Sequence, residues 1–170
     1  MTTDKWGPVT WILIHVLAQR VHPSSLHELF NLIKSLVSNL PCPLCSDDSK
    51  KFLSKINTLG IKEPMHLQDI YFLFHNIVNK KKNKPIFEKN KLNNYNNIYI
   101  IPVYKHFIKV YNSNGNIKLL QDNFQRDIVK KNLNTYIRKY ISLFIIPKIN
   151  SSELKDKPSE NENSENQDSK

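Results

Sequence analysis

Cysteine is scarce in this chain, whose 170 residues contain only Cys42 and Cys45, separated by two positions. Small secreted proteins that depend on disulfides for stability carry several well-spaced cysteines, so this class is excluded. A pair spaced this closely points either to redox chemistry or to half of a metal site.

Long apolar runs are also missing, and none comes near the roughly 20 residues that cross a bilayer. The N-terminal stretch, which includes Asp4, Lys5 and His15, lacks the composition and the cleavage site of a signal peptide. We therefore expect a cytosolic protein that is neither secreted nor membrane-spanning.

The net charge of +10 is unevenly distributed, because residues 151–170 hold three Lys against six Asp and Glu. The excess of basic residues over 1–150 is compatible with binding to nucleic acid, to an anionic membrane or to an acidic partner. It is equally compatible with a solvated surface that binds nothing. The chain has neither an aromatic platform for RNA nor a DNA-reading motif. We therefore expect no nucleic-acid partner.

Hydrophobic periodicity predicts four helices in the first half of the chain, at about residues 10–21, 26–40, 43–60 and 66–81. Short links marked by proline or glycine separate them. The clearest apolar stripe is that of the second helix, formed by Leu26, Leu29, Phe30, Ile33, Leu36, Val37 and Leu40. An antiparallel bundle over residues 1–95 is the simplest architecture for four such helices.

The composition changes after Pro85. Residues 90–97 contain five Asn and predict a loop, while residues 98–103 and 105–111 look β-like. A turn at 113–116 leading to 117–120 completes a predicted hairpin, and a helix is expected over 124–144. We therefore predict a mainly α fold with a small α+β appendage over 96–150, followed by a disordered acidic tail over 151–170.

The Cys42-Pro43-Leu44-Cys45 segment can close a disulfide across one helical turn. At a helix start the unpaired N–H groups favour the thiolate of the first cysteine, and Pro43 suits the first helical position. A zinc site would need histidine as its other ligands, but no suitably spaced His pair follows. In a thioredoxin-like fold the motif would follow a strand, whereas here it follows a helix.

Two other blocks carry polar or aromatic groups of interest. Trp11 and His15 lie four residues apart and share a helix face, although a core Trp beside a satisfied His would give the same pattern. Gly7 after Trp6 would allow close approach of another group, or would simply form a turn.

In the fourth helix His75, Asn79 and Lys82 fall within about 60° of one another. This polar stripe would suit a cofactor with phosphates, or it would be an ordinary solvated flank.

Taken in order, three blocks resemble the Erv/ALR family of FAD-linked sulfhydryl oxidases over about Trp6 to Phe87. They are W-G-x-x-x-W-x-x-x-H from Trp6, C-x-x-C from Cys42, and H-N-x-V-N from His75 with a following Lys84-Pro85. The Leu40–Cys45 context is most similar to the short members encoded by large cytoplasmic DNA viruses. The resemblance implies four helices and a short fifth turn around FAD, usually in a homodimer. The implied reaction converts 2 R–SH and O2 into R–S–S–R and H2O2.

The resemblance also implies roles for individual residues. Cys45 would lie beside the flavin C4a as the charge-transfer thiolate, and Cys42 would exchange with substrate. Residues expected to bind FAD are Trp6 and Gly7 at its entry, Trp11 and His15 along it, His75, Asn76, Val78 and Asn79 on its adenine and ribose side, and Lys82 and Lys84 near its pyrophosphate.

The chain departs from cellular members at several positions. A structural disulfide of theirs would fall at Phe72 and about Lys89, so the bundle must rely on packing or dimerisation. A basic residue soon after the Trp-Gly pair is replaced by Pro8. The aromatic residue expected after Lys-Pro has no clear counterpart, with Tyr95 and Tyr99 as candidates.

With only two cysteines the chain carries no second thiol pair to shuttle electrons. We therefore expect Cys42 to meet a dithiol relay protein, thioredoxin-like or C-x-x-C-bearing, with oxygen as acceptor. The expected location is the host-cell cytoplasm, free or associated with virus particles. The alternative is a zinc- or partner-binding helical scaffold without catalysis.

Overall fold

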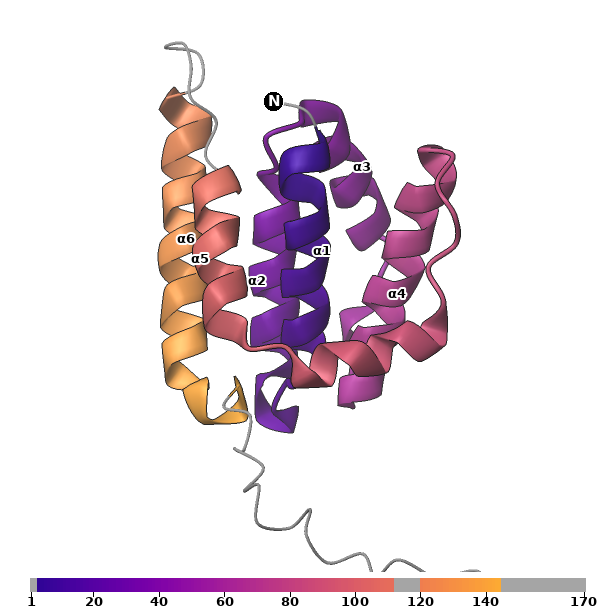
Figure 1. Cartoon of the computed structure of the whole chain (residues 1–170), viewed down its shortest axis with the longest axis vertical. Helices are drawn as coiled ribbons and strands as arrows, with labels where there is room; N and C mark the ends of the chain where they lie inside the picture. The colour runs from indigo at the N-terminus through magenta and orange to yellow at the C-terminus, as the bar shows by residue number, and fades with distance from the viewer. Residues whose placement is uncertain (1–2, 112–119, 145–170) are drawn as a thin grey trace, which may run out of the picture.

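The computed structural model describes residues 3–111 and 120–144, and the part of the chain it describes is helical (Figure 1). The α-helices are α1 (Thr3–Gln19), α2 (Leu26–Ser38), α3 (Pro43–Leu53), α4 (Pro64–Lys81), α5 (Ile100–Tyr111) and α6 (Leu120–Lys139). The 3-10 helices are η1 (Pro23–Ser25), η2 (Thr58–Gly60), η3 (Lys89–Asn97) and η5 (Ile141–Phe144). None of the helices in the described ranges is long and apolar enough to cross a bilayer.

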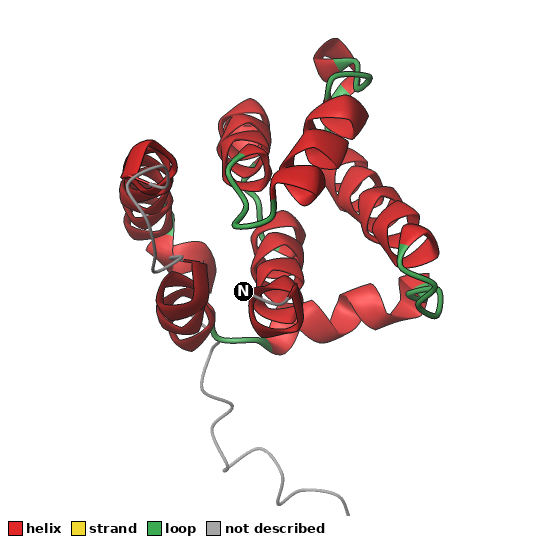
Figure 2. Ribbon diagram, turned by 90° about the horizontal axis from the view of Figure 1, so that it is seen from above, coloured by secondary structure: helices red, strands yellow, loops and turns green. Residues whose placement is uncertain are grey.

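The first helix is at the centre of the arrangement, as the view from above shows (Figure 2). It packs against α4 and η3 on one side and against α5 on the other. Leu13, Val16 and Leu17 are fully buried as a result. The helix begins at Thr3, earlier than the predicted residue 10, and includes Pro8, which is exposed and costs it one internal hydrogen bond.

The bundle of the first half is confirmed, with corrections at its element boundaries. The third helix ends at Leu53, and the 3-10 turn η2 follows in place of a continuous helix to residue 60. Residues 89–97 form the 3-10 helix η3, where a loop was expected. Local polar composition favoured a loop, but Leu92 is buried and anchors this segment.

The β-like prediction for residues 98–103 and 105–111 is wrong, because this segment is the helix α5. Its β-branched residues favoured a strand, but Ile100, Phe107 and Tyr111 follow a helical spacing and are completely buried. Tertiary packing of this face outweighs the local propensity. The described part of the appendage is therefore helical, with no strand in either range.

The helix predicted at 124–144 is confirmed as α6 and η5, and its first residue is Leu120. The turn at 113–116 and the tail at 151–170 lie outside the described residues. Val129, Leu133 and Tyr136 of α6 join the same buried cluster as the first four helices. The core therefore continues across residue 95, and the domain boundary there stays a prediction.

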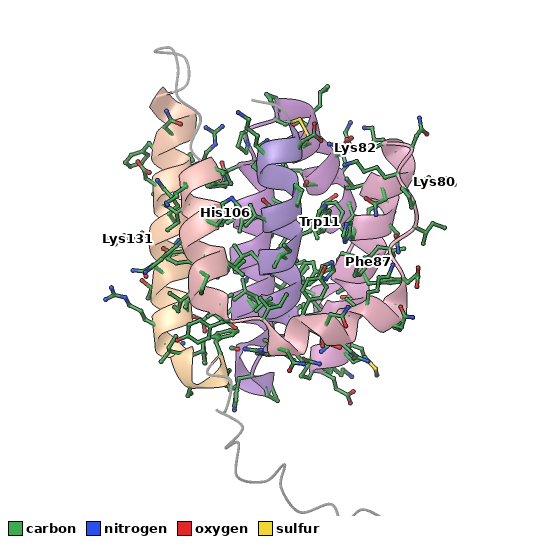
Figure 3. The ribbon with its side chains drawn as sticks, viewed as in Figure 1. Trp11, Lys80, Lys82, Phe87, His106 and Lys131 are labelled. Atoms are coloured by element: carbon green, nitrogen blue, oxygen red, sulfur yellow. A yellow bond between two sulfur atoms is a disulfide. The ribbon has the colours of Figure 1, made fainter. Side chains whose placement is uncertain are left out.

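Replacing Phe107 with Ala tests whether α5 belongs to the core. Loss of a buried ring should lower the free energy of unfolding by about 3–5 kcal/mol, measured by urea denaturation. Its exposed neighbour His106 (Figure 3) is the matched control, and His106→Ala should change it by no more than about 0.5 kcal/mol. Equal, small effects of the two changes would contradict the placement of α5.

Candidate functional site

The two cysteines are joined at the corner between α2 and α3. Cys42 is the N-cap of α3, Pro43 takes the first helical position, and the Cys42–Cys45 disulfide spans 5.2 Å between Cα atoms. The backbone N–H of Cys45 donates to Cys42 Sγ at 3.2 Å. Both cysteines are half-buried, while Leu44 between them is 77% exposed. One side of the pair is thus accessible to another molecule.

A cavity of about 580 Å³ lies beside this pair, within the usual size range of small-molecule sites. Its walls come from α1, α2, α3 and α4. Of the predicted site residues, those that line it are Trp6, Gly7, Trp11, Cys42, Cys45, Val78 and Lys82. The structure therefore brings residues from all three sequence blocks to one cavity.

The predicted His15 and His75 lie next to this cavity in an aromatic cluster, which we define as Trp11, His15, His75, Phe87 and Tyr95. The Trp11 and His75 rings are parallel with centroids 4.1 Å apart, and His15 Nε2 lies 3.0 Å from His75 Nδ1. Phe87 stacks on both imidazoles, and Tyr95 contacts His15. Trp11 belongs to both features and joins the cluster to the cavity.

Both imidazoles of the cluster are held in the neutral form. Burial, assisted by the neighbouring His75, lowers the pKa of His15 from 6.5 to about 3. Burial and the charge of Lys84 lower the pKa of His75 from 6.5 to about 4. At neutral pH the pair can therefore share one N–H···N hydrogen bond and present flat, uncharged surfaces.

Phe87 was missed in the sequence, although it follows Lys84-Pro85 by two residues. The aromatic residue expected after that dipeptide has only Tyr95 and Tyr99 as candidates in the sequence prediction, and Tyr99 is 48% exposed. The Asn76 side chain holds Phe87 through its backbone, donating to its carbonyl at 3.0 Å and accepting from its N–H at 2.7 Å. Asn76 therefore positions Phe87, and both of its side-chain polar atoms are engaged in doing so.

The segment after α4 is also tied down near the place of the missing disulfide. Lys89 Nζ pairs with Asp69 Oδ1 at 2.7 Å, and the Phe72 ring lies 6.1 Å from that of Phe87. These contacts join α4 to the following chain by packing and charge.

The remaining predicted residues lie at the end of α4. Asn79 is buried, and its carbonyl accepts from the backbone N–H of Lys84 at 2.9 Å. This turn passes through Asn83, whose φ of 52° is in the left-handed region that Asn tolerates. Lys82 is exposed and lines the cavity, whereas Lys84 does not line it.

The residues of the cavity fit a flavin nucleotide. Among the described residues, the buried Trp6 Nε1 on the wall and His15 Nδ1 beside it have no hydrogen-bond partner, and an acceptor-rich ligand would satisfy the indole N–H. A Cβ added at Gly7 would meet nothing within 4 Å, so the cavity has room there. Cavity-lining lysines on α3 and at the end of α4 provide positive charge for phosphates.

A zinc site finds no support in the same region. Cys42 and Cys45 are bonded to each other, and a disulfide offers no thiolate to a metal. Within residues 3–111 and 120–144 there is also no group of three or more His, Cys, Asp or Glu side chains placed to hold an ion.

Comparison with known proteins gives two kinds of match. A model of the Erv1 / Alr family matches residues 8–97. FAD-linked sulfhydryl oxidases of African swine fever virus, isolates Pig/Kenya/KEN-50/1950 and Tick/Malawi/Lil 20-1/1983, are each 32% identical over 98 residues, which are 55% of this chain and 79% of the relative. No solved structure matches.

The neutral imidazoles predict a pH dependence of stability for the chain without added cofactor. The folded pKa values are lower than 6.5, so the unfolded chain binds more protons at intermediate pH. The contribution of the two neutral imidazoles to the free energy of unfolding should be fully present above about pH 6.5. It should be lost as the pH decreases toward about 4. Urea denaturation of the wild type and of His75→Gln at several pH values measures this.

The variant should show a shallower loss of stability over that range, and His106→Gln, at an exposed position of α5, should behave as the wild type. A wild-type stability that stays constant between these pH values would contradict the neutral pair.

Proposed function

Since the chain belongs to the Erv1 / Alr family, we propose that Cys42 and Cys45 are its redox-active thiols and that they form disulfides in partner proteins. The family and its viral relatives make the chain a thiol oxidase with FAD as cofactor. The observation that carries the assignment is the Cys42–Cys45 disulfide on the wall of a cavity that fits a flavin.

The first half-reaction needs only this chain and a dithiol substrate. A substrate thiolate attacks Cys42 Sγ, a substrate–Cys42 disulfide forms, the Cys42–Cys45 bond breaks and Cys45 leaves as a thiolate. The second substrate thiolate then displaces Cys42, forming the substrate disulfide. The electron pair is left on the Cys42–Cys45 dithiol, and the two substrate protons are released or taken up by these thiols.

The helix start supports the role of Cys42 in this exchange. When Cys42 is a thiolate, the N–H of Cys45 and the other unpaired N–H groups of α3 stabilise its charge. Cys45 lies one turn into the helix, and the family resemblance assigns it to the flavin side. The pair would therefore have one member for substrate and one for the cofactor.

The chain's own residues would hold FAD along the cavity. Trp6, Trp11 and Val78 provide apolar walls, Lys82 provides charge for the pyrophosphate, and the half-buried His75 lies against Trp11 on the expected adenine side. When bound, FAD supplies the two-electron chemistry that passes the pair from the dithiol to oxygen and yields H2O2. The disulfide is the one covalent bond of this chain that breaks in the reaction, and the polar side chains of the cavity serve only to bind the cofactor.

The electron donor in this proposal is a dithiol relay protein, thioredoxin-like or C-x-x-C-bearing. Its support is that the chain has no cysteine besides the pair. The family resemblance also supports a homodimer, which sedimentation measures. The proposal also places the protein in the host-cell cytoplasm, free or on virus particles.

Lys82 and Lys80 offer a matched test of the cofactor site. Lys82 lines the cavity, whereas its neighbour Lys80 does not, and both are exposed to solvent (Figure 3). Loss of a charge-assisted hydrogen bond costs about 1.5–3 kcal/mol, so Lys82→Met should weaken FAD binding by about tenfold to a hundredfold. Lys80→Met should leave the dissociation constant, measured by flavin fluorescence, unchanged. Equal effects would refute the placement of the phosphates.

Substituting each cysteine tests the roles of the pair. Either Cys→Ser variant should reduce thiol-dependent oxygen consumption to the rate without protein, because the disulfide cannot form. When mixed with the relay protein in its disulfide form, Cys45→Ser should nevertheless accumulate a mixed disulfide, because the Cys42 thiolate attacks the relay disulfide and one relay thiolate leaves. Cys42→Ser should trap far less. Mass spectrometry of the trapped complexes reads this out.

If the mixed disulfide with the relay protein formed only through Cys45, in the Cys42→Ser variant, the roles assigned to the two cysteines would be reversed. Equal oxidation of diverse unfolded thiol proteins by the wild type would contradict a dedicated relay partner.

A further inference from the structure

The link between α2 and the redox pair is short. The helix ends at Ser38, Asn39 is its C-cap, and only Leu40 and Pro41 intervene before Cys42, the N-cap of α3. The last turn of α2 therefore sets, together with α3, the position of Cys42. Whatever fixes this turn also fixes the disulfide relative to the cavity.

Two side chains from outside the family-matched segment hold this turn. Tyr111, the last residue of α5, donates its hydroxyl hydrogen to the Leu36 carbonyl at 2.9 Å. Arg126 of α6 donates from Nε to the Asn39 carbonyl at 3.0 Å. Tyr111 is fully buried and Arg126 is 3% exposed, and both follow residue 97, where the family match ends.

These contacts lie at the C-terminal end of α2, where the backbone carbonyls lack hydrogen-bond donors from a following turn. The last carbonyls of an α-helix have no partner within it, and a positive charge near them is favourable. Asn39 Nδ2 donates to the Ser35 carbonyl, and Ser46 Oγ donates to that of Leu40. The backbone N–H of Asn39 donates to the Leu36 carbonyl at 3.2 Å, so the Tyr111 hydroxyl is a second donor there, and Arg126 supplies a donor to the Asn39 carbonyl.

We propose that Tyr111 and Arg126 are positioning residues for the Cys42–Cys45 pair, through which α5 and α6 hold the two sulfurs at disulfide distance beside the cavity. The proposal rests on the proposed function of the pair. A reduced pair requires no particular separation of its sulfurs, but a disulfide does. Anchors at the end of α2 should therefore favour the disulfide over the dithiol.

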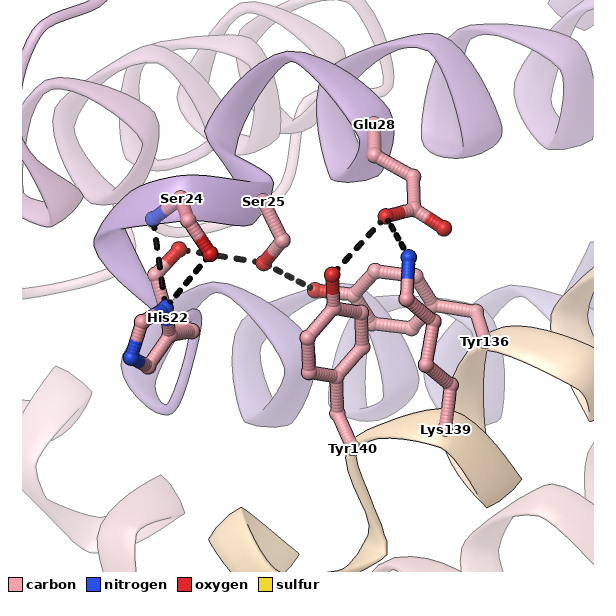
Figure 4. A network of polar contacts seen from close by, with 7 residues as sticks. All are labelled: His22, Ser24, Ser25, Glu28, Tyr136, Lys139 and Tyr140. Carbon is pink, nitrogen blue, oxygen red and sulfur yellow. Dashed lines mark hydrogen bonds and ion pairs between the residues drawn. The ribbon is translucent and has the colours of Figure 1, made fainter.

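Helix α6 and the residue after it are also tied to the other end of α2, which provides a control. Tyr136 Oη lies 3.1 Å from Ser25 Oγ at the start of α2, and Lys139 and Tyr140 both contact Glu28 (Figure 4). Tyr136→Phe removes one hydroxyl from a buried tyrosine, as Tyr111→Phe does, but at the end of α2 that is far from the disulfide.

The experiment equilibrates the full chain with glutathione buffers in the absence of oxygen and measures the fraction of Cys42–Cys45 disulfide by alkylation and mass spectrometry. Tyr111→Phe and Arg126→Met should each shift the equilibrium toward the dithiol by about threefold, the effect of one hydrogen bond. Tyr136→Phe should not shift it, although its melting temperature should fall as that of Tyr111→Phe does.

An equilibrium constant for Tyr111→Phe equal to that of Tyr136→Phe, or a shift toward the disulfide, would overturn the proposal. Tyr111→Phe alone decides the matter if Arg126→Met does not fold. The measurement involves neither turnover nor oxygen. An absence of thiol oxidation in the wild type would therefore refute the proposed function and leave the effect on the equilibrium measurable.

Discussion

The burial of α1 is the constraint on which the rest of the structure depends. This helix is covered by α4 and η3 on one side and by α5 on the other, and its central aliphatic residues are inaccessible to solvent. Burying each such side chain contributes about 1.5–3 kcal/mol. Trp6 and Trp11 stand on the same helix, so the packing that fixes α1 also fixes one wall of the cavity and one face of the aromatic cluster.

The opposite wall depends on α2, because the redox pair follows its last turn. Helices α5 and α6 contact α1 and α2 respectively, and they are the part of the chain beyond the family match. Residues of these C-terminal helices belong to the same buried cluster as those of the first four. They complete the core on the side away from the cavity and reach the carbonyls that precede Cys42.

The sequence was informative where a pattern was local and strong. The bundle was predicted from the apolar stripe of α2, the proline at the start of α3 and the three motif blocks. The fold places Trp11, Cys45 and Val78, one residue from each block, on one cavity. The sequence pattern gave the wrong prediction at α5, because its β-branched residues favour a strand. Packing of its helical face on α1 outweighs that preference. Phe87 was also missed, although it follows Lys84-Pro85 by two residues, because its place depends on the two hydrogen bonds between its backbone and the Asn76 side chain.

The central claim is that electrons pass from thiols to the cofactor only through Cys42 and Cys45. Anaerobic titration of the FAD-loaded full chain with dithiothreitol, followed by the visible absorbance of the flavin, tests this most directly. The account predicts rapid bleaching in the wild type and none on the same timescale when both cysteines are replaced by Ser. Bleaching at equal rates in the two proteins, or no bleaching in the wild type, would contradict it.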